Sequence, residues 1–252
     1  MSFSELHLDR DRAGSFGSVA EQYEAHRPAF PDPLLDDLAA LGARRALDVA
    51  CGTGKLGRGL ARRGVDVLGV ELDPRMAGVA RKLGLPVEVA RFEDWDDAGR
   101  QFDLVTCGDA WHWIDPRRGA EKVARVLAPG GVFALVWNLQ VLEEPARAAL
   151  APVYRELAPE VFPYGGPPPP DASLPPLEGP FSPAEVRTYG WERRLSGAEW
   201  AAVMPTISDH QRRLTPERLR ALQDGARAAL RGLGETVLVR GTTTAMLARR
   251  LA

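Results

Sequence analysis

The chain has 252 residues, 45% apolar and 26% charged, which is enough to bury one substantial core with a smaller elaboration. A formal charge of −2 and an isoelectric point near 6.1 argue against a general electrostatic grip on nucleic acid. The sequence has two cysteines and four histidines, and the histidines show no metal-ligand spacing. No apolar run approaches the roughly 20 residues that cross a bilayer. These features predict a reduced, cytoplasmic protein without a metal or a membrane span. We expect a monomer or a homodimer.

The N-terminal segment, residues 1–30, contains Tyr23, His26 and Arg27 and is too polar to belong to the core. Residues 31–138 form the predicted core domain. Between Arg45 and Asn138, short apolar runs alternate with helix-like segments, which is typical of a parallel sheet. The predicted strands are Ala46–Cys51, Val65–Glu71, Val87–Arg91, Phe102–Cys107 and Val132–Trp137, and the predicted helices are Lys55–Arg63, Arg75–Leu83 and Pro116–Leu127.

Proline becomes frequent after Asn138. Of the 21 prolines, 11 lie between Pro152 and Pro183, including the run Pro167–Pro170. Because proline disrupts regular helices and central strands, we interpret residues 139–183 as an inserted loop or lid. Residues 184–252 are expected to complete the sheet and to add helices on the substrate side, with the elements Val186–Leu195, Gly197–Met204, Pro216–Arg231 and Val237–Ala248.

A glycine-rich segment leads from the first predicted strand into the first helix. Gly52, Gly54 and Gly57 let a ligand lie against bare backbone. Glu71 follows Gly52 by 19 residues, at the end of the second strand, where a carboxylate can bind ribose hydroxyls. The same glycine spacing fits a dinucleotide site, so an NAD(P)-binding oxidoreductase remains an alternative.

Asp48 distinguishes between these cofactors. A dinucleotide site directs a helix N-terminus at a pyrophosphate anion and gains nothing from a carboxylate close by. S-adenosylmethionine (SAM) carries an ammonium and a sulfonium group, which an acid attracts. Asp48 therefore favours SAM, although the same residue at a strand end could instead cap the loop amides.

Five segments occur in the order Leu47–Gly54, Gly69–Met76, Phe102–Val105, Ala110–Asp115 and Leu127–Gly131. Together they resemble class I SAM-dependent methyltransferases of the small-molecule branch, which includes trans-aconitate methyltransferase-like (methyltransferase type 11) and ubiquinone-biosynthesis-like enzymes. The resemblance implies an α/β fold: a Rossmann-like, doubly wound, mostly parallel seven-stranded sheet with helices on both faces and a late lid insertion. It also implies methyl transfer from SAM to a small-molecule acceptor by in-line displacement. A SAM-binding regulator without catalysis is a further alternative.

The resemblance also implies which residues bind the cofactor. It assigns Asp48, Gly52 and Gly54 to the methionine part of SAM, Glu71 to the ribose and Leu72 to the adenine face. The other residues assigned to the cofactor pocket are Met76 at one side, Ala50, Cys51 and Cys107 at the wall, Phe92 and Glu93 at the adenine ring, and Tyr23 and Arg27 in a lid over the carboxylate of SAM. Arg91 stands where an acid usually binds adenine, and Glu93 is its expected replacement.

Fewer sequence features indicate which residues bind the methyl acceptor. His112 either acts as a general base or polar contact for the acceptor or anchors its loop. Trp111 and Trp113 either line the substrate pocket or pack in the core. A small organic acid is one expected acceptor, because four arginines after Trp191 could bind its carboxylate. The same four residues could instead be solvated surface residues: Arg193, Arg194, Arg212 and Arg213.

Overall fold

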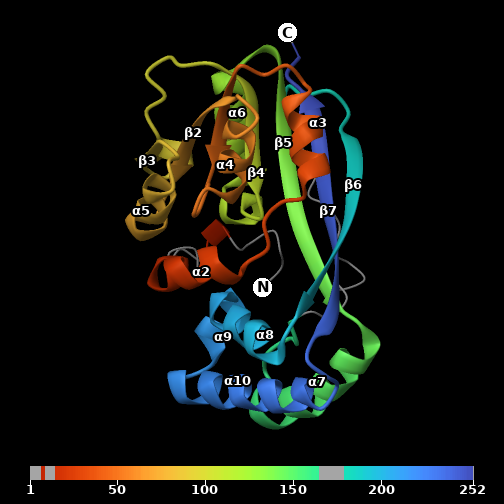
Figure 1. Cartoon of the computed structure of the whole chain (residues 1–252). Helices are drawn as coiled ribbons and strands as arrows, with labels where there is room; N and C mark the ends of the chain where they lie inside the picture. The colour runs from red at the N-terminus through yellow and green to blue at the C-terminus, as the bar shows by residue number, and fades with distance from the viewer. Residues whose placement is uncertain (1–6, 9–14, 165–178, 252) are drawn as a thin grey trace.

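The computed structural model describes residues 7–8, 15–164 and 179–251. One seven-stranded sheet runs through this part of the chain in the order β3-β2-β1-β4-β5-β7-β6 (Figure 1). In the part of the chain that the structure describes, β7 is antiparallel to both of its neighbours, and the other paired strands are parallel. The strands are β1 (Arg45–Val49), β2 (Asp66–Glu71), β3 (Val87–Val89), β4 (Phe102–Gly108), β5 (Leu127–Leu142), β6 (Glu185–Leu195) and β7 (Val237–Arg249). The predicted Rossmann-like, mostly parallel sheet is confirmed.

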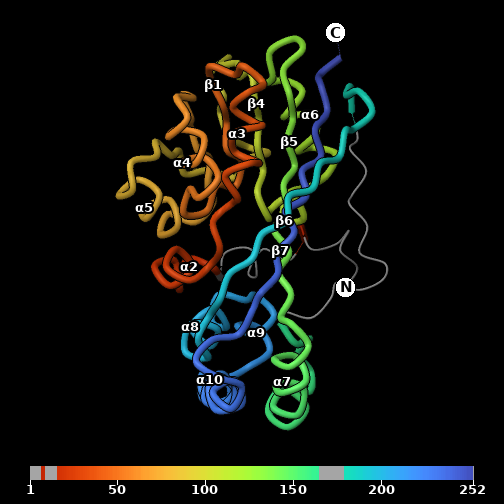
Figure 2. The backbone as a smooth tube through the Cα atoms, turned by 45° about the vertical axis from the view of Figure 1, so that its right-hand side comes forward, coloured from red at the N-terminus to blue at the C-terminus, as the bar shows by residue number. Residues whose placement is uncertain are grey.

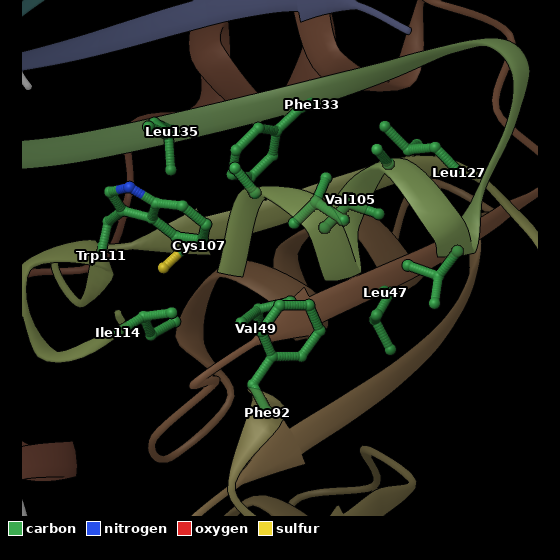
Figure 3. Packing of buried hydrophobic residues seen from close by; sticks show 14 of the residues in the cluster. Leu47, Val49, Phe92, Val105, Cys107, Trp111, Ile114, Leu127, Phe133 and Leu135 are labelled. Atoms are coloured by element: carbon green, nitrogen blue, oxygen red, sulfur yellow. The ribbon is translucent and has the colours of Figure 1, made fainter. Parts of the chain in front are cut away.

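Helices cover both faces of this sheet because neighbouring strand residues point to opposite sides. Ala46 packs toward α3 (Asp32–Ala39), α4 (Lys55–Ala61) and α5 (Pro74–Lys82). Leu47 and Val49 point the other way, into a cluster that α6 (Pro116–Val126) covers, and Figure 3 shows them facing Phe92 and Val105. The two apolar clusters hold the carboxyl ends of β1, β2 and β4 in a fixed arrangement.

A second group of helices lies at the far ends of β5, β6 and β7, where Figures 1 and 2 show it separate from the helices on the sheet. We call it the helical unit. It consists of α7 (Glu144–Leu157), α8 (Gly197–Val203), the 3-10 helix η5 (Met204–Thr206), α9 (Ser208–Arg213) and α10 (Pro216–Arg231). Trp200, fully buried, lies at its centre together with Leu222 and Tyr154. The pairing of β5 with β7 extends as far as Leu142 and Val239, which connects the helical unit to the sheet.

Two expectations for the middle of the chain were wrong. Strand β5 is much longer than the predicted Val132–Trp137. The proline-rich region is not one loop, because α7 continues through Pro152. Pro152 is on the exposed side of α7, while Ala146, Leu150 and Tyr154 pack into the helical unit, and this burial outweighs the missing backbone hydrogen bond. The run Pro167–Pro170 lies outside the described residues.

The start of α8 offers a test of this local structure. Ser196 Oγ accepts the Glu199 amide at 3.2 Å, and Glu199 Oε2 accepts the Ser196 amide at 2.8 Å, which together make a capping box. We expect Ser196→Ala to lower the free energy of unfolding by about 1 kcal/mol in urea titrations. Ser196→Asp keeps an acceptor and should stay within a few tenths of a kcal/mol of wild type, since acidic caps serve equally well. Equal losses in both variants would contradict the role of the cap.

Candidate functional site

A cavity of about 320 Å³ lies at the carboxyl ends of β1, β2 and β4. The chain reaches β4 only after forming β2 and β3 on the other side of β1, so the strand order reverses between β1 and β4. Such a reversal leaves a crevice at the strand ends, where ligands of open α/β sheets bind. Helix α2 (Ala20–His26) lies between this end of the sheet and the helical unit (Figure 1), and its residue Tyr23 lines the cavity.

The glycine loop forms one wall. Ala50, Gly52 and Gly54 have φ values of 49°, 56° and 81°, a left-handed conformation that glycine adopts without strain. Ala50, Cys51 and Gly52 line the cavity. Gly54 lies behind them as the N-cap of α4, and a Cβ there would approach Leu85 to 2.8 Å. The loop therefore presents backbone to the cavity, as its sequence predicts.

Asp48 lines the cavity and is also bound to α4 and β4. Its Oδ2 accepts the Gly57 amide at 2.9 Å, and its Oδ1 accepts the Thr106 hydroxyl at 2.9 Å. Burial raises the pKa of this carboxyl to about 7, against the lowering effect of both hydrogen bonds. Asp48 thus binds an amide in the first turn of α4, rather than one in the loop, while it also lines the cavity. Thr106 was missed by the sequence analysis.

Glu71 joins the end of β2 to the glycine loop. Its Oε2 accepts the Gly52 amide at 2.8 Å, and its Oε1 accepts the Asp73 amide at 2.9 Å. Burial raises the pKa of Glu71. Leu72, 46% exposed, and the buried Met76 line the cavity beside it. A carboxylate with spare lone pairs therefore lies next to an apolar surface.

The chain after β3 supplies the opposite wall through Phe92 and Glu93. Glu93 Oε1 accepts from Arg91 Nη2 and from the Asp115 amide, both at 3.0 Å. Arg91 is therefore bound to Glu93, the residue expected to take the place of the usual adenine-binding acid. Glu93 also fastens this wall to the segment after β4.

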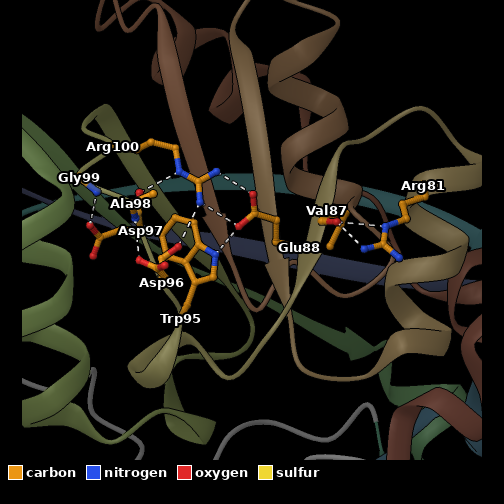
Figure 4. Close-up of polar contacts among 9 residues, drawn as sticks. All are labelled: Arg81, Val87, Glu88, Trp95, Asp96, Asp97, Ala98, Gly99 and Arg100. Carbon is orange, nitrogen blue, oxygen red and sulfur yellow. Dashed lines mark hydrogen bonds and ion pairs between the residues drawn. The ribbon is translucent and has the colours of Figure 1, made fainter.

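A cluster of polar contacts holds the loop that follows this wall (Figure 4). Glu88 of β3 accepts Trp95 Nε1 at 2.5 Å and the two terminal nitrogens of Arg100 at 2.7 and 2.9 Å. The guanidinium of Arg100 also lies over the Trp95 ring, 4.9 Å from its centre. This cluster fixes both ends of the loop, so that the wall formed by Phe92 and Glu93 is held against β3.

Helix α2 is attached on two sides. Arg27 donates to the Tyr164 hydroxyl and to the Thr206 carbonyl, both at 3.1 Å, and its guanidinium lies 5.4 Å from the centre of the Tyr23 ring. On the sheet side, Lys55 Nζ donates to the Glu24 carbonyl at 2.7 Å. Burial raises the pKa of Tyr23 to about 12, so its hydroxyl stays protonated. Tyr23 and Arg27 both line the cavity.

Four of the predicted site residues do not line the cavity: Gly54, Cys107, Trp111 and His112. Cys107 is fully buried in the cluster under α6, because it points to the opposite face of β4 from Thr106 (Figure 3). This placement disagrees with the expectation of a pocket-wall thiol. Trp111 packs on Phe133 with ring centres 5.0 Å apart, and the His112 ring lies 4.7 Å from that of Trp113. Trp113 lines the cavity.

None of the four arginines expected to bind an acid lines the cavity. Arg193 is engaged with Gln140 Oε1 at 2.7 Å and with the His26 carbonyl at 3.4 Å. Arg194, Arg212 and Arg213 are exposed. The structure therefore brings the cofactor candidates together but does not form the predicted arginine fork.

Asp109 is a cavity residue that the sequence analysis missed. It directly follows β4 and has a φ of 54°, which is uncommon for a residue with a side chain. Its Oδ1 accepts the Asn138 amide at 2.8 Å, and burial raises its pKa to about 6. The one available signal was an acid two residues after a predicted strand, directly before the segment Ala110–Asp115.

Two further observations on the described residues concern metals and membranes. They contain no group of three or more metal-ligating side chains placed to hold an ion. No helix within them combines the length and apolar character that crossing a membrane requires.

Comparison with known proteins assigns the family. A family described as a methyltransferase domain matches residues 47–135. An uncharacterised methyltransferase of Mycobacterium tuberculosis is 44% identical over 132 residues, 51% of this chain and 54% of that protein, so the chain spans about half the length of this relative. A ubiquinone biosynthesis O-methyltransferase of Xanthomonas oryzae pv. oryzae is 36% identical over 182 residues, 65% of this chain and 72% of that protein.

A solved structure agrees with this assignment over most of the fold. It is described as a candidate type II methyltransferase from Anaeromyxobacter dehalogenans, is 25% identical, and covers 89% of this chain and 98% of its own with a TM-score of 0.66. With the shared sheet, the glycine loop and the matched segments in the same order, the chain belongs to the class I SAM-dependent methyltransferases.

Proposed function

We propose that this protein binds SAM in the cavity and transfers its methyl group to a small-molecule acceptor, releasing S-adenosylhomocysteine. The observation that carries the proposal is the pair of buried carboxylates, Asp48 and Glu71, on either side of the glycine loop. Among the described residues neither carboxylate has an ion-pair partner, although both line the cavity. A ligand with an ammonium group and ribose hydroxyls would supply the missing partners.

Two orphaned polar atoms support the fit of such a ligand. Arg27 Nε and Thr53 Oγ1 are buried and have no hydrogen-bond partner within the described chain, and both residues line the cavity. A buried donor without an acceptor costs about 1–3 kcal/mol, so a ligand carboxylate near Arg27 would be favourable. Because α2 holds Arg27 beside Tyr23, this helix is well placed to close over the methionine end of SAM.

The remaining cofactor roles follow from position on the cavity wall. We assign Asp48 and the loop backbone at Ala50, Cys51 and Gly52 to the methionine part of SAM, and Glu71 to the ribose. The apolar side chains at the other end would enclose the adenine, with Glu93 at its edge; they are Leu72, Met76 and Phe92.

Bound SAM supplies a methyl group on an already activated sulfonium leaving group. The chain's own residues therefore have to hold the donor and acceptor in line and exclude water. Tyr23 and Trp113 would do this from two sides of the cavity. Since the His112 ring packs on Trp113 and is absent from the cavity wall, we favour the anchoring role for His112.

Calorimetric titration distinguishes the proposal from its alternatives. We expect SAM and S-adenosylhomocysteine to bind, and NAD and NADP to show no heat of binding at the same concentrations. Tighter binding of NAD or NADP would instead establish an oxidoreductase. Activity is tested with methyl-labelled SAM and fractions of a broad metabolite extract. If SAM binds tightly and no fraction accepts label, a regulatory SAM-binding protein becomes the better account.

A ubiquinone biosynthesis O-methyltransferase is among the relatives. Its name makes oxygen a reasonable first atom to examine in the labelled fractions. An organic acid would need a cationic contact. Of the two arginines that line the cavity among the described residues, Arg91 is hydrogen-bonded to Glu93, whereas Arg27 is hydrogen-bonded to a hydroxyl and a carbonyl. We assign Arg27 to the cofactor, so the acceptor has to be recognised by other groups.

A further inference from the structure

Two hydrogen bonds hold Asp109 on the wall of the cavity. Its amide donates to the Val136 carbonyl at 2.8 Å, while its Oδ1 accepts the Asn138 amide at the same distance. These contacts stabilise the left-handed backbone at φ 54°. Strained backbone conformations of non-glycine residues are concentrated at functional sites. The strain here places a carboxylate on the cavity wall.

The second oxygen of Asp109, Oδ2, has no hydrogen-bond donor among the described residues. The titratable groups around this carboxylate are Arg27 and Tyr23 of α2 and Cys107 of β4. Arg27 is hydrogen-bonded to Tyr164 and Thr206, and it lowers the pKa of Asp109 less than burial raises it. The carboxyl therefore has a pKa of about 6, suited to accepting a proton near neutral pH.

Aromatic side chains line the cavity to which Asp109 belongs. Phe16, Phe30 and Trp113 line the same cavity, and the Phe16 ring lies 6.0 Å from the Trp113 ring and 6.1 Å from the Tyr23 ring. Such walls fit a flat, uncharged acceptor molecule. A carboxylate acceptor would place a second anion beside Asp109, which is unfavourable in a site shielded from water.

We propose that Asp109 is the proton acceptor in methyl transfer and that the methyl acceptor is an uncharged hydroxyl group on an aromatic body. This inference rests on the proposed function. The hydroxyl oxygen forms a bond to the methyl carbon, and the carbon–sulfur bond breaks with its electron pair going to sulfur. The hydroxyl proton passes to Oδ2 of Asp109. No further reactant is required.

Asp109→Asn is the informative variant. Its amide oxygen keeps the bond to the Asn138 amide, and asparagine tolerates the left-handed backbone. Asp103→Asn is the matched control, because Asp103 lies at the start of β4, far from Asp109 at the other end, and binds the Arg44 and Arg45 amides there. Both variants should bind S-adenosylhomocysteine within threefold of wild type.

Binding is measured on the full chain saturated with S-adenosylhomocysteine, using 4-methylphenol and 4-methylbenzoate at pH 7.5 with ligand-observed NMR. Wild type and Asp103→Asn should bind the phenol at least tenfold more tightly than the benzoate. Asp109→Asn should reduce this ratio to threefold or less. Equal binding of the two probes by wild type would overturn the acceptor class.

Transfer is measured in single turnovers of labelled SAM with 4-methylphenol between pH 4.5 and 8. The wild-type rate should rise up to about pH 6 and then level off, because the deprotonated carboxylate is the active form. Asp109→Asn should be roughly 100-fold slower and lose this pH dependence. An Asp109→Asn rate within tenfold of wild type with the same profile, or bound cofactor without any transfer to the phenol, would overturn the role of Asp109. Failure to bind the cofactor would overturn the proposed function itself.

Discussion

Replacement of Glu71 by alanine is expected to raise the dissociation constant of S-adenosylhomocysteine on the order of 1000-fold. The substitution removes the acceptor proposed for the ribose hydroxyls, and a hydrogen bond to a charged group contributes about 1.5–3 kcal/mol. Two such bonds give roughly 4 kcal/mol, or about three powers of ten in affinity. It also releases the Gly52 amide, which Glu71 holds at 2.8 Å, so the loop loses part of its shape.

Glu185→Ala provides the control for this measurement. Glu185 is an exposed strand glutamate of β6 that pairs with Arg187 and does not line the cavity. Calorimetry at pH 7.5 should give a dissociation constant within threefold of wild type for Glu185→Ala. A loss of less than tenfold in Glu71→Ala would refute the assignment of Glu71 to the ribose.

The second large effect concerns stability and pH in the ligand-free protein. Burial raises the pKa of Asp48 to about 7, whereas an aspartate in an unfolded chain has a pKa near 3.9. A raised pKa means that the folded state favours the protonated form. The contribution of Asp48 is therefore fully present below about pH 4 and is lost as the pH rises through 7. At about 1.4 kcal/mol per unit of pKa shift, the loss approaches roughly 4 kcal/mol.

Asp48→Asn isolates this contribution from other titrating groups. Its free energy of unfolding in urea, relative to wild type, should increase by about 3 kcal/mol between pH 5 and pH 8. The amide oxygen can still accept from Gly57 while the amide nitrogen donates to Thr106, so the packing is kept. The exposed Asp66→Asn should follow the wild-type curve. Parallel curves for Asp48→Asn and wild type would show that Asp48 does not titrate in this range.

The sheet was predictable where burial on both faces leaves continuous apolar runs. Strands β1, β2 and β4 were found within two residues of their observed bounds. The extension of β5 after Trp137 was missed because polar residues alternate with apolar ones there, and the buried residue Gln140 is polar while Leu139 is exposed. The helix through Pro152 was missed for a different reason. Its stability comes from tertiary packing, which local proline rules do not include.

The predicted site was most accurate where a motif specifies backbone geometry, as in the glycine loop. It was least accurate at the end of β4, where side-chain direction depends on strand register. Neighbouring residues of a strand face opposite sides. Cys107 was assigned to the cavity wall, but its side chain points into the core. Asp109 reaches the cavity through a left-handed turn after the strand. No residue pattern in the sequence specifies that turn, because aspartate adopts it only occasionally.

The position of β7 at the end of the sheet-forming sequence also affects how the protein folds during translation. Among the described residues, strand β6 pairs with β7 alone and one edge of β5 pairs only with β7, yet β7 follows both of them in the chain. During translation the ribosome therefore releases β5, the helical unit and β6 before the strand that joins them. Until then the nascent chain carries an open sheet edge and an unpaired strand, both of which invite aggregation. The glycine loop is synthesised early, but the sheet that supports it becomes protected only when Val237–Arg249 has emerged.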